Sequence, residues 1–420
     1  MDDEPLTELD RLDELHLSEL SFTPDEYARR TTAVRARMTE RNIRFVVLTD
    51  PTDVEYITGF VAAHASFAAL ALPITGTPQF LVSLADHAVV CARSWVKTCV
   101  TYEPGAPMTT ALLGLLHELE AGELELRGES ATLDSVGLQY SVPQRSVVEA
   151  QRQALVRGFP HLLWPDASTI VADVRVTKSL PEINRIETAL RWTEAALDTA
   201  VMACVKGASE NNVVAAMTNR LLGGSASSAR WPTYHPRVLV GGVAATAGTG
   251  IAGRVITGTF EGESAGQLVL IDCGACCDGY TAAEQRTVFV GEVRPWWLDT
   301  GEALVNAAID AQLRIMKVGT TGAQLYAAAC DVLDQGMVPG SHLSHMGNSV
   351  GLGSCTDGAD SDFQLTRFSE VTLKDRMVLS LNPAIQTPWG LLAISVLARV
   401  GARRGVVLGK PTRSIVSVTG

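Results

Sequence analysis

The segment Leu268 to Glu292, LVLIDCGACCDGYTAAEQRTVFVGE, is the feature that most constrains how this chain can fold. It opens with four apolar residues, Leu268 to Ile271, which predict a buried strand. Asp272 follows this strand, then a Gly- and Cys-rich stretch predicts a turn, and a second β-rich run covers Thr287 to Val290. The segment therefore predicts a β-hairpin that carries polar side chains at its bend.

Length and charge limit the class of protein. At 420 residues the chain is long enough to form two or three domains with sizeable cores. Its net charge of −12, from 34 basic and 46 acidic residues, provides no basic face to offset repulsion by phosphates. We therefore expect no nucleic-acid partner.

The cysteine residues and the N-terminal sequence indicate where in the cell the protein is expected. The eight Cys include one CxxC pair, Cys273 and Cys276, but no second pair and no nearby His accompany it, so a metal or redox role is disfavoured. A reducing cytoplasm is the simpler interpretation. The acidic N-terminus lacks the apolar core of a signal peptide, and no apolar run is long enough to span a membrane, so we expect no membrane partner.

The first half of the chain predicts an α/β domain. After a charged lead-in at residues 1–20, residues 21–41 predict a helix, because Thr23 suits an N-cap and Pro24 the first helical position. Helix and strand then alternate to about residue 150, which fits a small mixed sheet. The clearest strands are expected at Phe45–Leu48, Ala68–Pro73 and Gln79–Val82.

The second half contains a faint internal duplication. Val176 to Leu197 has a helical apolar stripe and predicts the helix with which a second domain begins. Residues 205–210 echo residues 316–321, and each segment is a Gly-containing turn with a hydroxyl that can cap a following helix. The predicted organisation is a lead-in at 1–20, one domain at 21–160 and a second at 161–420.

The hairpin resembles that of the pita-bread metallopeptidases and creatinase, whose usual form is iDxGxxxxGYxxDxTRTFxVGE. The first Asp of this pattern is present as Asp272, but the second falls on Ala283. The other matching residues are Gly274, Gly279, Tyr280, Arg286, Thr287, Val290, Gly291 and Glu292. The resemblance implies an α/β (α+β) fold in which a creatinase-like N-terminal mixed-sheet domain precedes a pita-bread domain with a pseudo-twofold duplication.

Four of the five metal-ligand positions of that family are replaced. The segment Met346 to Leu352 fits the family's GHxxG string, with Asn348 at the His position. The two Glu positions fall on Asn382 and Ser395, so Asp272 alone survives. Amides and a hydroxyl are poor replacements for anionic oxygens, so we expect no metal and no other cofactor.

The creatinase mechanism does not carry over either. The segment that carries its catalytic His aligns with Gly241 to Gly250, which has no His, and one of its Glu positions falls on Gln285. What remains is a largely neutral pocket that suits an uncharged polar or aromatic ligand. The residues predicted to contact a small-molecule substrate are Asn348, Asn382, Ser395, Asp272, Cys355, Tyr280 and His64.

Three residues are candidates for acid/base catalysis, and each has a plain structural alternative. His345 and His235 titrate near neutrality, but either could be an ordinary loop histidine. His342 competes with His345 for a place in the pocket. Glu284 would act as a base if it pointed inward in place of Gln285, since neighbours in a strand face opposite sides; otherwise it is a surface glutamate.

Less evidence from residue chemistry supports the remaining two candidates for substrate contact. Cys355 lies where the family often has a second His, but no base is assigned that would activate its thiol. His64 lies on a loop that, in creatinase-like dimers, reaches toward the neighbouring subunit's site. The same resemblance implies that this protein is a homodimer.

Our leading hypothesis is a metal-independent, creatinase-like enzyme that acts on a small polar molecule by acid/base chemistry. The reaction would be C–N hydrolysis, or an elimination, cyclisation or rearrangement in specialised metabolism. A second hypothesis is a catalytically inactive pseudo-peptidase that binds a protein or peptide. The third is a metal-dependent Xaa-Pro peptidase, which requires the motif register to be wrong at several positions.

Overall fold

The chain forms two compact units, Met1–Arg175 and Val176–Gly420, in a computed structural model. The structure describes residues 20–61, 67–127, 135–140, 149–223, 236–241, 254–257, 266–336, 341–353 and 363–418. The predicted lead-in up to residue 19 lies outside these ranges, as do His64, His235 and Cys355.

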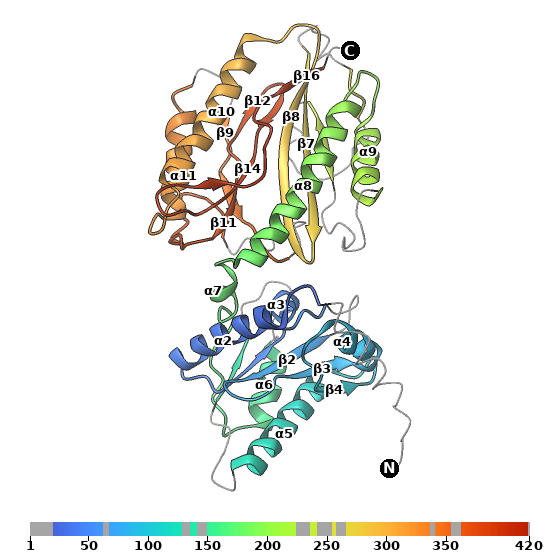
Figure 1. The fold of residues 1–420 in the computed structure, drawn as a ribbon, viewed down its shortest axis with the longest axis vertical. Coiled ribbons are helices and arrows are strands. Elements are labelled where there is room, and N and C mark those ends of the chain that lie inside the picture. Colours follow the sequence, from blue (N-terminus) through green and yellow to red (C-terminus); the bar gives the residue numbers. More distant parts are fainter. Residues whose placement is uncertain are drawn as a thin grey trace. The chain divides into compact units, whose positions relative to one another are not determined.

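The first unit is a five-stranded mixed sheet with the strand order β4-β3-β2-β1-β5. Strand β1 pairs antiparallel with β2 and parallel with β5, so the sheet is mixed. The alternation of helix and strand predicted a mixed sheet. Figure 1 shows its helices lying against this sheet. Its elements are α2 (Pro24–Glu40), β1 (Phe45–Leu48), α3 (Pro51–Thr58), β2 (Ala68–Pro73), β3 (Gln79–Ser83), η2 (Leu84–Asp86), α4 (His87–Arg93), β4 (Cys99–Tyr102), α5 (Met108–Arg127), β5 (Val136–Leu138), α6 (Glu149–Gly158) and α7 (Ala172–Arg175).

Residues 161–175 belong to the first unit, although the sequence placed the domain boundary at 160/161. Leu163 forms a parallel bridge to Ser135, just before β5, and Asp166 forms one to Leu138 within β5. The amide of Ala167 donates to the carbonyl oxygen of Leu138. These backbone contacts extend the first sheet's edge, so the compact units divide only after Arg175.

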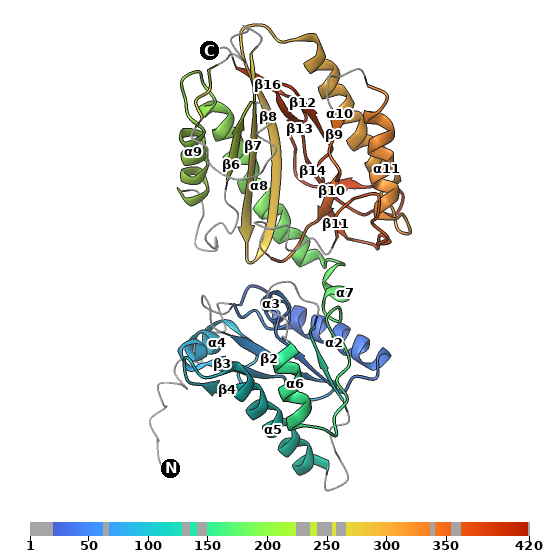
Figure 2. The same ribbon diagram turned by 180° about the vertical axis from the view of Figure 1, so that it is seen from behind.

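The second unit has strands between two pairs of helices (Figure 2). Its sheets have the strand orders β16-β8-β7-β6, β10-β11-β14-β15 and β13-β12-β9. The elements are α8 (Leu180–Ala203), α9 (Glu210–Gly223), β6 (Arg237–Val240), β7 (Gln267–Cys277), β8 (Tyr280–Val290), α10 (Trp296–Ile315), α11 (Gly322–Leu333), β9 (Ser341–His342), β10 (Gly347–Ser349), β11 (Val378–Leu381), β12 (Ala384–Thr387), β13 (Gly390–Ala393), β14 (Val396–Arg399), β15 (Val406–Val407) and β16 (Val416–Val418).

The helices predicted after the two copies of the duplicated segment are present as α9, which begins at Glu210, and α11, which begins at Gly322. Helix α8 begins with a capping box in which the Ser179 hydroxyl and the Glu182 carboxylate each accept a backbone N–H. Thr321 and Gln324 form the same arrangement at α11. One apolar core joins α8 and α9 to β6–β8, and a second joins α10 and α11 to β11, β12 and β14.

The central hairpin is longer and its turn tighter than the sequence indicated. Strands β7 and β8 each have 11 residues, and only Asp278 and Gly279 separate them. These two residues have φ values of 49° and 82°, the positive values that a type I′ turn requires. Cys273, Cys276 and Cys277, which we expected in a turn, are therefore buried strand residues.

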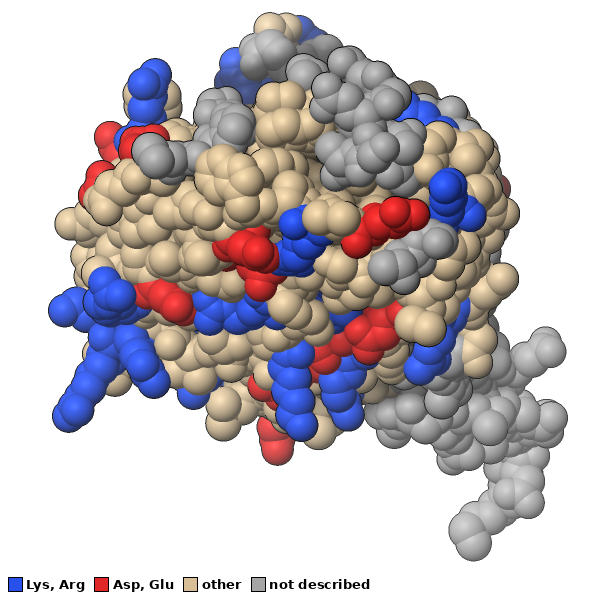
Figure 3. Space-filling view, turned by 90° about the horizontal axis from the view of Figure 1, so that it is seen from above, with Lys and Arg blue, Asp and Glu red and all other residues tan. Residues whose placement is uncertain are grey.

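None of the helices in the described ranges combines the length and hydropathy needed to cross a membrane. Figure 3 shows Lys and Arg side chains beside Asp and Glu side chains over the middle of one face.

Candidate functional site

The β7–β8 hairpin separates two environments because its side chains alternate between two faces. Ile271 and Cys273 on β7, and Val288 on β8, belong to the core beneath α8 and α9. Asp272 is paired with Gln285 across the hairpin, so both point to the opposite face. Ala283, at the second Asp position of the family, shares that face by the same alternation.

A carboxylate is buried on this second face and held by two donors. The Asp272 side chain is 6% exposed. Its Oδ2 accepts a hydrogen bond from Nη2 of Arg237 at 2.5 Å and another from Nε2 of Gln285 at 3.2 Å. Both bonds converge on one oxygen, and no hydrogen bond from a described residue reaches Oδ1. Asp272 is thus oriented by an ion pair and retains one carboxylate oxygen for a ligand.

Ser395 lies beside this group. Its Oγ accepts a hydrogen bond from the backbone amide of Gln285 at 2.6 Å, and its own amide donates to the carbonyl oxygen of Gln285 at 3.3 Å. The Ser395 side chain is buried. The structure therefore brings three of the expected positions together: Asp272, Gln285 and Ser395.

Asn348 and Asn382 lie on adjoining strands of the second unit. Asn348 is in β10 opposite Ser380 of β11, while the alternating residues Leu379 and Leu381 face the core beneath α10 and α11. Its Nδ2 donates to the carbonyl oxygen of Ser349 at 2.9 Å. Asn382 directly follows β11, and its buried Oδ1 receives no hydrogen bond from the described residues. This oxygen is a second acceptor available to a ligand.

Glu284 does not share the face of Asp272, so the expectation that it points inward is wrong. It is paired with Cys273, on the side covered by α8, and is 1% exposed. Its Oε2 lies 4.0 Å from Nη2 of Arg286, and Oε1 has no hydrogen-bond partner within the described ranges. Burial raises the pKa of Glu284 to about 8, while the Arg286 guanidinium opposes that rise and the carboxylates of Glu194 and Asp198 add to it.

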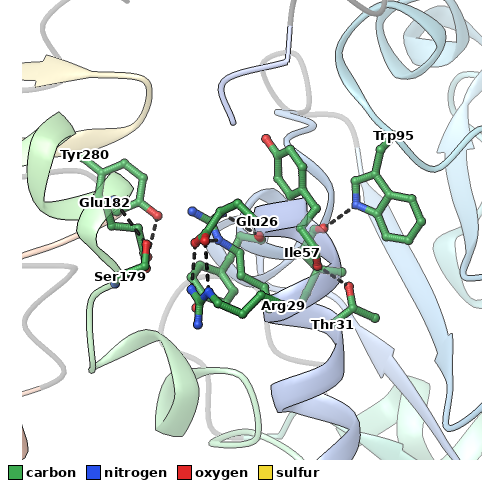
Figure 4. Close-up of polar contacts among 11 residues, drawn as sticks. Glu26, Arg29, Thr31, Ile57, Trp95, Ser179, Glu182 and Tyr280 are labelled. Carbon is green, nitrogen blue, oxygen red and sulfur yellow. Dashed lines mark hydrogen bonds and ion pairs between the residues drawn. The ribbon is translucent and has the colours of Figure 1, made fainter. Parts of the chain in front are cut away.

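Tyr280 is also on the face of α8, and the prediction that it contacts substrate is wrong. Its hydroxyl donates to Oε1 of Glu182 at 2.8 Å, and Oε2 of the same glutamate accepts the amide of Ser179 at 2.7 Å (Figure 4). The ring is buried. Tyr280 therefore joins the hairpin to the capping box at the start of α8.

The two neighbouring histidines differ in their surroundings. His342 has Nε2 at 3.2 Å from Oδ1 of Asp334, the C-cap residue of α11, and Nδ1 at 3.0 Å from the carbonyl oxygen of Leu343. His345 is half-buried, burial lowers its pKa, and its ring makes no hydrogen bond within the described part of the chain. His345 is therefore the better candidate of the two for proton transfer.

Arg237 is a site residue that the sequence did not single out. It is the first residue of β6 and is paired with Asp272 in the β6–β7 ladder. An arginine at the start of a predicted strand, just after the motif containing His235, was the available signal. Its importance depends on the antiparallel register of two strands separated by 26 residues, a register that local sequence does not specify.

The two-unit fold defines the architectural class, and sequence comparison gives the family. Residues 184–407 match metallopeptidase family M24, and residues 30–177 match the creatinase/prolidase N-terminal domain. Because the first match covers more than half of the chain, the protein belongs to the M24 family. The predicted fold, a creatinase-like N-terminal domain followed by a pita-bread domain, is confirmed.

Individual relatives are distant but cover nearly the whole chain. Creatinase from Bacillus sp. is 24% identical over 88% of this chain and 86% of its own length. Ectoine hydrolase from Halomonas elongata is 23% identical over 89% and 92%. The crystal structure of dipeptidase PepE from Mycobacterium ulcerans, at 20% identity, covers 95% of this chain and all of its own, with a TM-score of 0.75. The relatives' names describe hydrolases, and they support a creatinase-like hydrolase.

The name of the family implies a metal, but the residues present do not fit one. The five ligand positions hold Asp272, Ala283, Asn348, Asn382 and Ser395. Asp272 is already paired with a guanidinium, whose charge would repel a second cation. Among the described residues, no group of three or more His, Cys, Asp and Glu side chains could hold a metal ion. No reaction step is therefore assigned to a metal.

Proposed function

We propose that this protein is a metal-independent, creatinase-like hydrolase that acts on a small polar molecule by acid/base chemistry. The proposal is carried by the contacts of Asp272. This residue is the one acid left at the five ligand positions, and Arg237 and Gln285 hold its Oδ2. A C–N hydrolysis fits the superfamily best, while elimination, cyclisation or rearrangement uses the same groups.

The described side chains include candidates for ligand binding and one candidate for proton transfer. Oδ1 of Asp272 and Oδ1 of Asn382 are acceptors, so they suit a ligand that presents N–H or O–H donors. The lowered pKa of His345 keeps its imidazole neutral at pH 7, the form that accepts a proton. His345 is therefore proposed as the general base, and Asp272, Asn382, Asn348 and Ser395 as the binding residues.

Three further features of the proposal follow from the resemblance and the composition. We propose that the enzyme is a homodimer, that it works in the cytoplasm, and that it needs no cofactor. A role in specialised metabolism suits a site whose ligand positions have been refilled with neutral residues. His64, His235 and Cys355 remain proposed contributors outside the described ranges.

The decisive experiment measures turnover without metal. The full-length protein is treated with EDTA, checked by elemental analysis, and incubated with small amides and ureas, with product formation followed by mass spectrometry. We expect metal-free turnover of at least one compound that falls at least 100-fold in H345A and D272N. Loss of all turnover after EDTA treatment, with recovery on adding Mn²⁺, would contradict the proposal.

A pseudo-peptidase that binds a protein or peptide is the alternative, and it is favoured by the same four neutral replacements. It predicts no turnover by wild-type protein and unchanged binding of a peptide partner in H345A. A metal-dependent Xaa-Pro peptidase is a weaker alternative, since it needs His345 rather than Asn348 at the family's His position. The Gly351-Leu352 match favours Asn348 at that position.

A further inference from the structure

Arg237 and Asp272 form an ion pair at the place where the family has its metal. The two residues are direct partners in the β6–β7 ladder, and Nη2 lies 2.5 Å from Oδ2. The carboxylate is 6% exposed and the arginine side chain 42% exposed, so the acid is buried behind its partner. Because the bond joins a guanidinium to a carboxylate, it is a charge-assisted hydrogen bond, which is stronger than a neutral one.

The ion pair alters what can bind to the carboxylate. A divalent cation is held best by several anionic oxygens, so Asp272, with only amides and a hydroxyl at the neighbouring positions, would bind one weakly even without its partner. A cation approaching Asp272 would also lie within a few ångströms of the guanidinium, where like charges repel strongly in a poorly solvated site. Because the pair is neutral as a whole, it also gives no net charge to attract a cationic substrate.

We propose that Arg237 is a resident cation that takes the place of the metal charge. It positions Asp272 through Oδ2, turns Oδ1 toward the ligand, and selects neutral ligands with N–H or O–H donors over cations and divalent metals. This assignment rests on the proposed metal-independent function and names the residue that enforces it. Arg237 acts through Asp272, so it is a positioning residue.

The test is the binding of Mn²⁺ to the full-length protein, measured by electron paramagnetic resonance of the free ion. We expect wild-type protein to bind Mn²⁺ negligibly. R237Q removes the charge but keeps a polar side chain, and should bind the ion at least 10-fold more tightly. The gain should disappear in R237Q/D272N, because the sole anionic ligand is then lost.

Two controls separate a specific effect from a structural one. R237K retains the charge and should exclude Mn²⁺ as wild type does. R185Q breaks an ion pair with Asp278, 2.7 Å long, at the turn of the same hairpin, and should leave Mn²⁺ binding unchanged. Circular dichroism checks that each variant is folded, and a misfolded R237Q is replaced by R237M in the same series.

The outcomes distinguish this inference from the proposed function. Equal exclusion of Mn²⁺ by wild type and a folded, uncharged variant would overturn the role of Arg237 while leaving metal-free turnover untouched. Tight binding of Mn²⁺ by wild type that is lost in D272N would overturn both. Metal exclusion that depends on Arg237 in a protein without turnover would uphold the inference and contradict the proposed enzyme.

Discussion

Replacing Glu284 by glutamine should make the protein more stable at pH 8 and change little at pH 4.5. The carboxyl of Glu284 is buried between β8 and α8, and burial raises its pKa from 4.5 to about 8. Between these values the folded state holds a proton that the unfolded state has released, so the free energy of unfolding falls as pH rises.

The size of the effect follows from the two pKa values. A pKa difference of 1 unit corresponds to about 1.36 kcal/mol. The rise of the Glu284 pKa to about 8 therefore lowers the free energy of unfolding by up to about 5 kcal/mol by pH 8. At pH 7 the loss is about 3 kcal/mol on the same scale. Glutamine has the same shape without a titrating group, so E284Q should lack this loss.

The assay is urea denaturation of wild type and E284Q at pH 5, 6, 7 and 8. The stability difference in favour of E284Q should widen steadily over this range. E292Q is the matched control, because Glu292 follows the same strand but is exposed. A difference between wild type and E284Q that stays constant from pH 5 to pH 8 would refute the reasoning, and so would a variant that is less stable at pH 8.

Three more substitutions test the contacts that hold the hairpin in place. Y280F removes the buried hydrogen bond to Glu182 and should lower the free energy of unfolding by about 1–3 kcal/mol, measured by urea denaturation; an unchanged value would mean that the bond is not made. T193V removes a hydroxyl that bonds backbone groups on both β7 and β8 and should cost at least about 2 kcal/mol, with faster amide hydrogen exchange in both strands; protection that stays at the wild-type level would contradict this. G279A places a Cβ at φ 82° and should cost about 1–2 kcal/mol, whereas a thermal midpoint equal to that of wild type would show that the turn differs.

The sequence was a good guide to the fold where local signals are strong. Pro24 after Thr23 marked the start of α2, and the Ser179–Glu182 spacing lies at the start of α8, near the helix expected from Val176. The five small residues Cys273 to Cys277 predict a bend, but they continue strand β7. The Asp278-Gly279 pair was the stronger signal, since it supplies the two positive φ values.

The site was less predictable because it depends on strand parity and on distant pairing. Once the two-residue turn is fixed, alternation decides that Gln285 faces Asp272 and that Glu284 and Tyr280 face α8. The sequence had left the choice between Glu284 and Gln285 open. Arg237 lies beside Asp272 because of the register between β6 and β7, and local sequence does not specify that register.

The length of the β7–β8 ladder restricts how this protein can diversify. Both faces of the hairpin are occupied, one by apolar side chains and the other by Asp272 and Gln285. Deleting or adding a single residue within β7 would exchange the two faces, moving a carboxylate into the packed interior and a thiol into the site. New chemistry at this position is therefore reachable by replacing one side chain at a time rather than by insertion or deletion within the strands.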